Sequence, residues 1–307
     1  EDVVLGVGDD AALLRVPPGR ELTVAMDTLV DGVHFPHGTD PAAIGHKALA
    51  VNLSDLAAMG ADPAWATLAL TLPQPDTDWL EAFARGFSAL AQRFDVQLVG
   101  GDLTRGPLTV TVQAHGLVPP QGALRRAGAR AGDEIYVTGT LGDAGLALRL
   151  LQEDIAVATM QRDFLVARLE YPQPRVQAGA ALRGLAGAAI DLSDGLLADL
   201  GHILEQSGVG ATLWVDRLPR SVAFRETLEG RPGLEAEWDG LPLAAGDDYE
   251  LCFTAAPARR AAVQEALSGL DCGYLKVGVV EQAAGLRCVH DDGSPCVAGA
   301  AGYRHFG

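Results

Sequence analysis

The chain has 307 residues, of which 48% are hydrophobic and 21% are charged, so it is long enough for about two domains with buried cores. Its 23 Lys and Arg residues against 40 Asp and Glu residues give a formal net charge of −17 at pH 7. This charge argues against nucleic acid or an anionic membrane as a partner. Neither of the two lysines lies in a Gly-x-x-x-x-Gly-Lys-Ser/Thr motif, which excludes a P-loop.

No segment is expected to span a membrane, because the longest uncharged stretch, residues 106–124, contains three prolines. The four cysteines lie in the last quarter of the chain, with no Cys-x-x-Cys pair and no adjacent histidine ligand pattern. They predict buried free thiols in a reducing, cytoplasmic compartment. No signal peptide is recognised, and a start at Glu1-Asp2 without Met suggests that an N-terminal piece is absent from this sequence.

The first 122 residues predict strands and helices bounded by capping residues. Asp40-Pro41 places Asp at the N-cap and Pro at the first position of a helix that ends at Gly60. Asp76 or Thr77 caps a second helix, whose aromatic residues recur at helical spacing and are read as core. Extended apolar runs predict strands at residues 21–26, with Asp27 at the end of the first, and at 65–72, 96–99 and 108–118.

A Pro-Pro-Gln-Gly sequence at residues 119–122 predicts a domain boundary, which separates an N-terminal domain (1–122) from a C-terminal domain (123–307). The second domain is predicted to be α+β. Its helices are predicted at residues 142–151, 173–185 and 195–206, and its strands at residues 134–138, 188–190, 211–215, 251–254 and 276–280.

Aspartate outnumbers glutamate, 26 to 14, and it gathers beside glycines or at the predicted ends of strands and helices. Each cluster alone is also compatible with a solvated turn. However, Asp102 and Asp191 follow short apolar runs, and Asp55 lies inside an apolar helix. Carboxylates that converge from such places repel one another unless a cation offsets them, and oxygen donors without His or Cys favour Mg²⁺. Because Mg²⁺ commonly bridges to phosphates, the pattern points to phosphoryl transfer.

Seven segments, in this order and spacing, resemble the thiamine-monophosphate kinase family. The sharpest are Asn-Leu-Ser-Asp-Leu-Ala-Ala-Met-Gly and Gly-Asp-Leu-Thr-Arg-Gly-Pro. The segments cover residues 6–14, 27–35, 47–63, 98–107, 132–139, 190–195 and 246–253, and the resemblance extends from Gly6 to Phe306. The family belongs to a superfamily with aminoimidazole ribonucleotide synthetase, selenophosphate synthetase and hydrogenase maturation proteins. The resemblance implies a mixed α/β, or α+β, fold with an N-terminal domain that forms a dimeric β-barrel with helices outside.

The resemblance also implies site residues and ligands: ATP as co-substrate, several Mg²⁺ ions, thiamine monophosphate and a second copy of the chain. The implied metal ligands are Asp10, Asp27, Asp55, Asp102, Asp191 and Asp194. The implied ATP contacts are Gly101, Asp102, Arg126 and Ser193, and the implied substrate contacts are His34, Asp247 and Tyr303. No catalytic residue in the strict sense is implied, because an ionised phosphate acceptor needs no strong base and the catalysis is electrostatic and metal-assisted.

Three departures from the family bear on these assignments. Ala25-Met26 stands where the family has Ser or Thr, Asp247 stands where it has Glu, and the family's helix before Gly6 is absent. Some of the implied contacts also have simpler interpretations. His34 can be a loop histidine bonded to backbone, Arg126 one of a solvated pair, and Tyr303 an anchor for the C-terminal tail.

Three functions remain in consideration. The first is ATP- and Mg²⁺-dependent phosphorylation of thiamine monophosphate to thiamine diphosphate by direct transfer. The second is another ATP-dependent reaction of the superfamily, such as that of aminoimidazole ribonucleotide or selenophosphate synthetase. Selenophosphate synthesis is disfavoured because no Cys or Lys precedes Lys47. The third is a non-enzymatic metal- or nucleotide-binding regulator, which the nearly intact aspartate set argues against.

Overall fold

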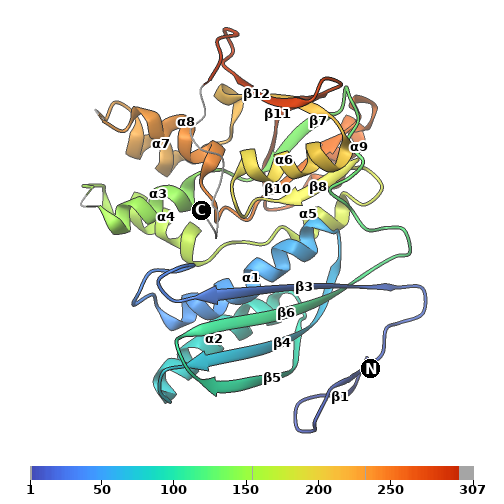
Figure 1. Cartoon of the computed structure of the whole chain (residues 1–307), viewed down its shortest axis with the longest axis vertical. Helices are drawn as coiled ribbons and strands as arrows, with labels where there is room; N and C mark the ends of the chain where they lie inside the picture. Colours follow the sequence, from blue (N-terminus) through green and yellow to red (C-terminus); the bar gives the residue numbers. More distant parts are fainter. Residues whose placement is uncertain (1, 154, 232, 297–307) are drawn as a thin grey trace.

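The computed structural model describes residues 2–153, 155–231 and 233–296. The described residues form two main sheets, a four-stranded sheet within residues 21–118 and a six-stranded sheet within residues 134–289. Helix α1 lies between them (Figure 1). A short hairpin, β1 (Val3–Leu5) with β2 (Leu13–Leu14), stands apart from both sheets in the same view.

The four-stranded sheet has the order β3-β6-β4-β5, in which β4 and β5 are parallel and the other pairs antiparallel. Both predicted helix starts are confirmed. The Asp40 side chain accepts from the Ala42 backbone N–H at 2.7 Å, and that of Asp76 accepts from Trp79 N–H at 3.0 Å. The elements are β3 (Glu21–Val30), α1 (Pro41–Ala58), β4 (Asp62–Leu72), α2 (Thr77–Arg93), β5 (Gln97–Arg105) and β6 (Thr109–Val118).

Two strands run further than their sequence pattern predicts. The prediction that β3 ends at Asp27 is wrong, because β3 pairs with β6 as far as Val30. The prediction that the strand at residues 96–99 ends at residue 99 is wrong as well, since β5 continues beside β4 as far as Arg105. A Cβ on Gly101 would lie 1.9 Å from the Leu68 carbonyl oxygen, so glycine permits this close pairing.

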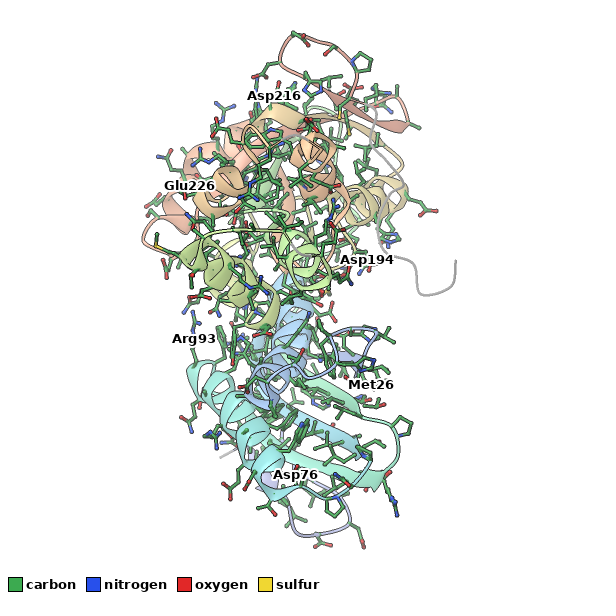
Figure 2. The ribbon with its side chains drawn as sticks, turned by 90° about the vertical axis from the view of Figure 1, so that its left-hand side faces the viewer. Met26, Asp76, Arg93, Asp194, Asp216 and Glu226 are labelled. Carbon is green, nitrogen blue, oxygen red and sulfur yellow. The ribbon has the colours of Figure 1, made fainter. Side chains whose placement is uncertain are left out.

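Helices α1 and α2 cover one face of the four-stranded sheet, and the opposite face is apolar and exposed. Met26 lies on the side of the sheet away from α2, the helix that runs between the labels of Asp76 and Arg93 (Figure 2). Its exposed fraction is 62%, and Leu22 and Val24, which alternate with it along β3, are exposed too. Among the residues that the structure describes, this sheet is open and does not close into a barrel.

The six-stranded sheet has the order β12-β9-β11-β7-β10-β8 and is antiparallel except for β12 and β9. Helix α6 packs on one face and helices α5 and α9 on the other, while α3, α4, α7 and α8 share a separate small core. The strands are β7 (Glu134–Thr138), β8 (Ala188–Asp191), β9 (Gly210–Trp214), β10 (Leu251–Ala255), β11 (Tyr274–Glu281) and β12 (Gly285–Val289). The helices are α3 (Asp143–Gln152), α4 (Thr159–Glu170), α5 (Val176–Ala181), α6 (Leu196–Ser207), α7 (Val222–Leu228), α8 (Glu235–Ala244) and α9 (Arg260–Leu267), with short 3-10 turns at Val215–Arg217 and Pro257–Arg259.

The helix predicted at residues 173–185 is shorter in the structure, because α5 ends at Ala181 before a turn with Gly184 at φ +73°. Helices α4, α7, α8 and α9 and strand β12 have no counterpart in the prediction. Helix α8 contains Pro242, a residue that argues against a helix in sequence reading. In the described part of the chain, no helix is both long enough and apolar enough to cross a bilayer.

Helix α1 packs against α2 at two glycines, and this close contact generates a stability prediction. A Cβ on Gly86 would lie 1.8 Å from the Ala42 carbonyl oxygen, and one on Gly45 would lie 2.2 Å from that of Phe83. Gly86→Ala therefore forces the helices apart, and we expect a loss of about 1–3 kcal/mol in the free energy of unfolding, measured by urea denaturation.

Gly201→Ala in α6 is the matched control, because an added Cβ there meets no atom within 4 Å. Alanine has the higher helix propensity, so this variant is expected to be neutral or more stable by up to about 1 kcal/mol. Equal destabilisation by both substitutions would contradict the role of the close helix contact.

Candidate functional site

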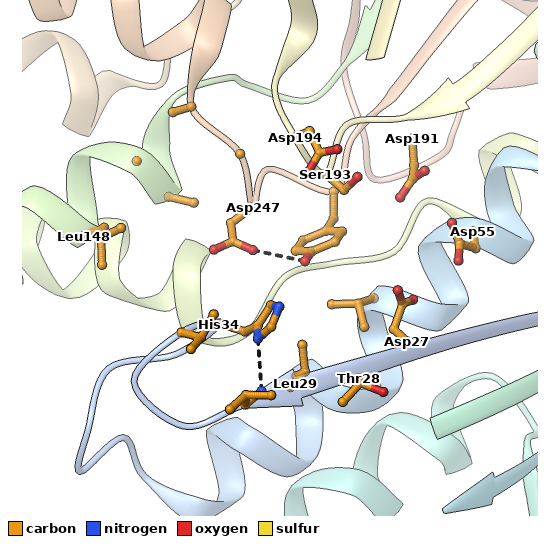
Figure 3. Close-up of a pocket in the computed structure, with 18 of the residues that line it drawn as sticks. Asp27, Thr28, Leu29, His34, Asp55, Leu148, Asp191, Ser193, Asp194 and Asp247 are labelled. Carbon is orange, nitrogen blue, oxygen red and sulfur yellow. Dashed lines mark hydrogen bonds between the residues drawn. The ribbon is translucent and has the colours of Figure 1, made fainter. Parts of the chain in front are cut away.

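A cavity of about 890 Å³ lies between the domain of the four-stranded sheet and the domain of the six-stranded sheet. Most of the site residues predicted from the sequence line it (Figure 3). Its walls come from β3, α1, α3, α8 and three loops, which follow β3, follow β8 and precede β10. The predicted residues that line it are Asp27, His34, Asp55, Asp191, Ser193, Asp194 and Asp247. Side chains from both halves of the chain therefore meet at one place.

One wall of the cavity is built of carboxylates. Asp27 comes from β3, Asp55 from α1 and Asp191 from the end of β8 (Figure 3). Two polar side chains on α1 fix this arrangement. Asn52 Oδ1 accepts from the Asp27 backbone N–H at 3.1 Å, and the Ser54 hydroxyl donates to Asp191 Oδ2 at 2.8 Å.

Burial makes ionisation of the three carboxyl groups unfavourable, and neighbouring aspartates add to this effect at Asp55 and Asp191. Burial, together with the charges of Asp191 and Asp27, raises the pKa of Asp55 to about 8. Burial likewise raises the pKa of Asp191 to about 6 and raises that of Asp27. Among the described residues, no Lys or Arg forms an ion pair with these three groups. The wall thus offers several hard oxygen donors and has an electrostatic need for a cation, which fits Mg²⁺.

The loop after β8 places Ser193 and Asp194 beside this wall. It is closed by Asp199 of α6, whose Oδ2 accepts from the backbone N–H groups of Asp194 at 3.0 Å and Gly195 at 3.1 Å. Burial and the nearby Asp191 raise the pKa of Asp199 to about 7. Gly195 has φ +111°, and a Cβ there would lie 2.8 Å from the Ala244 backbone, so this turn requires glycine.

The opposite end of the cavity carries His34 and Asp247 (Figure 3). His34 Nδ1 accepts from the Val30 backbone N–H at 3.0 Å, which leaves the proton of a neutral ring on Nε2. Asp247 Oδ1 accepts from the Tyr249 hydroxyl at 3.0 Å, and its other oxygen lies 3.1 Å from Lys47 Nζ. Leu148 lies on the side of Asp247 away from the carboxylate wall, and the lining also includes the apolar residues Val33 and Leu241.

The loop that carries Asp247 is anchored by the residues that follow it. Asp247 N–H donates to Ser193 O at 3.0 Å, and this bond joins the two loops of the site. Glu250, which is fully buried, accepts from Arg168 at 2.8 Å and from Arg175 Nε at 2.6 Å. Burial alone would raise the pKa of Glu250, but the bonds from Arg175 and the charge of Arg168 hold it below its usual value.

Four of the implied site residues that the structure describes do not line the cavity. Asp10 is exposed in the N-terminal segment, and Gly101 and Asp102 are exposed on β5, at the sheet edge opposite β3. Arg126 is exposed, yet its charge offsets part of the rise in the pKa of Asp55 and Asp191, so it faces the carboxylate wall. Tyr303 lies outside the described residues.

Sequence reasoning missed four residues that support the site, namely Lys47, Ser54, Asp199 and Tyr249. Ser54 and Tyr249 lie within two of the seven family-like segments, one residue from Asp55 and two residues from Asp247. Their position in these segments was an available signal. Lys47 is the first residue of the family-like segment at residues 47–63, but nothing in the sequence indicates that it is buried. Asp199 lies in the helix predicted at residues 195–206, and nothing in the sequence distinguishes it there from an exposed polar residue.

Comparison with protein families assigns the fold class. Residues 8–118 match the model of the AIR synthase related protein N-terminal domain, and residues 130–291 match that of the C-terminal domain. A crystal structure of E. coli HypE, 21% identical with a TM-score of 0.77 over 96% of this chain and 92% of that one, shares the fold.

Closer relatives define the family. A thiamine-monophosphate kinase of Salmonella typhimurium is 48% identical over 99% of this chain and 93% of its own length. The crystal structure of thiamine-monophosphate kinase from Stenotrophomonas maltophilia K279a has a TM-score of 0.88, at 49% identity over 96% and 93% of the two chains. AaThiL complexed with AMPPCP and TMP has a TM-score of 0.82, at 30% identity over 95% and 89%. The chain belongs to the thiamine-monophosphate kinase family.

The raised pKa values of the carboxylate wall generate a prediction about stability and pH. Asp55 has a usual pKa of 3.8 and one of about 8 in the folded chain, so its proton stabilises the fold fully below about pH 4. That stabilisation is lost as the pH rises towards 8. In a chelator, the melting temperature is therefore expected to fall between about pH 5 and about pH 8, and Mg²⁺ is expected to reduce the fall.

Asp55→Asn is the test of this assignment by thermal unfolding. It removes one of the titrating groups and relieves repulsion, so the decline with pH in the chelator should be weaker than in the wild-type protein. An Asp55→Asn chain with the same pH slope as the wild type would contradict the assignment.

Proposed function

We propose that the cavity between the two domains is the place where this chain carries out its reaction, the ATP-dependent phosphorylation of thiamine monophosphate to thiamine diphosphate. The activity is that of the family to which the chain belongs. The observation that carries the assignment is the meeting of seven implied site residues, from four separate segments, on one cavity. The acceptor is a phosphate that is largely ionised at neutral pH, so the chain's task is to hold two anions in line and to offset their charge.

Asp27, Asp55, Asp191 and Asp194 are proposed to hold Mg²⁺. Their oxygens are the donors that this ion prefers. The raised pKa values of Asp27, Asp55 and Asp191 follow from their burial in a cluster that has no ion-pair partner among the described residues. When bound, the metal would offset the negative charge that gathers around the transferred phosphoryl group. The cluster's own carboxylates, oriented by Asn52 and Ser54, supply the fixed geometry for this site.

The other end of the cavity is proposed to bind the thiamine part of the acceptor. Its apolar wall suits the rings, and Asp247 and His34 provide polar contacts. Asp247 is one methylene shorter than the family's Glu, but its carboxylate is oriented by Lys47 and Tyr249. Tyr303 remains a proposed contact that the described residues do not include.

Arg126 and Ser193 are proposed to contact ATP, and Arg126 gives a direct test. Arg126→Ala should raise the KM for ATP about tenfold, because a charged hydrogen bond to a phosphate is lost. Arg125→Ala removes the same charge from the neighbouring exposed position and should leave that KM within about twofold. Steady-state kinetics with varied ATP measures both, and an unchanged KM in Arg126→Ala would remove this residue from the site.

A homodimer is proposed to complete the site. The exposed apolar face of the four-stranded sheet is of a kind that monomers rarely leave open, and the superfamily implies a barrel made from two such sheets. We favour the pairing in which β3 of one copy lies beside β5 of the second. This pairing brings Gly101 and Asp102 of the second copy towards Asp27, which a single chain keeps at opposite edges of its sheet.

Mixing inactive variants tests this arrangement. Asp55→Asn and Asp102→Asn should each abolish turnover, because each removes a proposed metal ligand. In a mixed dimer one of the two sites keeps both residues, so co-expression of the two variants should restore about a quarter of the wild-type activity.

Asp55→Asn mixed with Asp191→Asn is the matched control. Both residues belong to one chain's cluster, so no site is intact and no activity should return. Failure of the first mixture to recover activity, or sedimentation of the wild type as a monomer at micromolar concentration, would contradict the shared site.

A further inference from the structure

Lys47 is a buried cation that the proposed function does not use. Its exposed fraction is 3%, although lysine is rarely buried without a specific partner. Its Nζ lies 3.1 Å from Asp247 Oδ2 and donates to the His34 carbonyl oxygen at 3.3 Å. Lys47 therefore contacts both of the described residues proposed to recognise the acceptor, while it does not itself line the cavity.

The three residues come from three separate segments. Lys47 lies on α1, His34 lies in the loop after β3, and Asp247 lies in the loop before β10 on the other domain. The lysine thus connects the two domains at the acceptor end of the cavity. Asp55 of the carboxylate wall lies on the same helix, about 12 Å further along its axis at 1.5 Å per residue. Helix α1 therefore carries Lys47 near the acceptor end of the site and Asp55 in the carboxylate wall.

The conformation of the Asp247 loop requires neighbouring side chains that hold it in place. Asp247 and Tyr249 have φ values of +68° and +49°, a region that non-glycine residues adopt only when their surroundings impose it. The Asp247 carboxylate is about one-third exposed, so it can turn towards solvent if its partners are removed. The Tyr249 hydroxyl holds one oxygen and Lys47 holds the other, which orients the carboxylate from two sides.

We propose that Lys47 is a positioning residue for the acceptor: its ammonium group sets the orientation of Asp247 and of the His34 loop, and thereby determines recognition of thiamine monophosphate without touching it. The inference rests on the proposed function, because it takes Asp247 as an acceptor contact. It assigns Lys47 no part in ATP binding, which the proposed site places at the opposite end of the cavity.

The test is Lys47→Met, which keeps the length of the side chain and removes its charge and donors. We expect the KM for thiamine monophosphate to rise at least tenfold while the KM for ATP changes by less than about twofold. Lys276→Met is the matched control, since Lys276 is the only other lysine and pairs with Glu134 on the far sheet. It should leave both KM values unchanged. A similar rise for both substrates in Lys47→Met would mean a general structural role and would overturn the proposal.

A double variant tests whether Lys47 acts through Asp247. If it acts mainly through Asp247, Lys47→Met with Asp247→Asn should have a KM for thiamine monophosphate no more than about threefold above that of Asp247→Asn alone, a remainder that the contact of Lys47 with the His34 carbonyl explains. Each single substitution leaves one charge of the Lys47–Asp247 pair without its partner, and the double variant has neither charge. The double variant can therefore be compared with Asp247→Asn even if Lys47→Met fails to fold. Independent, multiplying effects of the two substitutions would overturn the proposed route.

The same data separate this inference from the proposed function. If Asp247→Asn leaves the KM for thiamine monophosphate unchanged, the acceptor contact itself is wrong. If Asp247→Asn raises that KM and Lys47→Met does not, the acceptor contact stands and the positioning role of Lys47 is wrong.

Discussion

The structure depends on helix α1, which is buried on almost every side between the two domains. Its neighbours are α2, the four-stranded sheet, α5 and β8, and most of its 18 residues are inaccessible to solvent. A helix in such a place is usually apolar all round, and α1 largely is, with a run of Ala, Leu and Val. Its polar residues are therefore exceptions that need partners, and those partners define the site. Asn52 binds the backbone of Asp27, Ser54 binds Asp191, and Lys47 binds Asp247.

A second constraint follows from this arrangement, because α1 brings carboxylates of both domains within interaction distance. Their mutual repulsion and burial raise their pKa values, so the chain alone holds them only in part as anions. Under the proposed function, a bound divalent cation would reverse this preference, and the site would then offset the charge of two anionic substrates. The described cavity lining contains no cysteine or lysine, which agrees with a reaction in which the acceptor is already ionised.

The exposed apolar face of the four-stranded sheet and the separation of Asp102 from Asp27 have one explanation in the proposed dimer. An open sheet edge and an apolar face both favour association. A second copy would cover that face and would supply the missing residues to the cavity.

The sequence by itself determined the local features of this protein: the caps of α1 and α2, the strands β4, β6 and β7, the preference for oxygen ligands, and the family. Each of these depends on residues close together in the chain, or on the order of motifs. Only the tertiary structure decided that Asp27, Asp55 and Asp191 meet while Asp102 lies at the far edge of the sheet, and that Lys47 is buried against Asp247. The physical reason is that capping and side-chain periodicity act over a few residues. Which side chains share a cavity depends on how two separately formed sheets pack on a common helix.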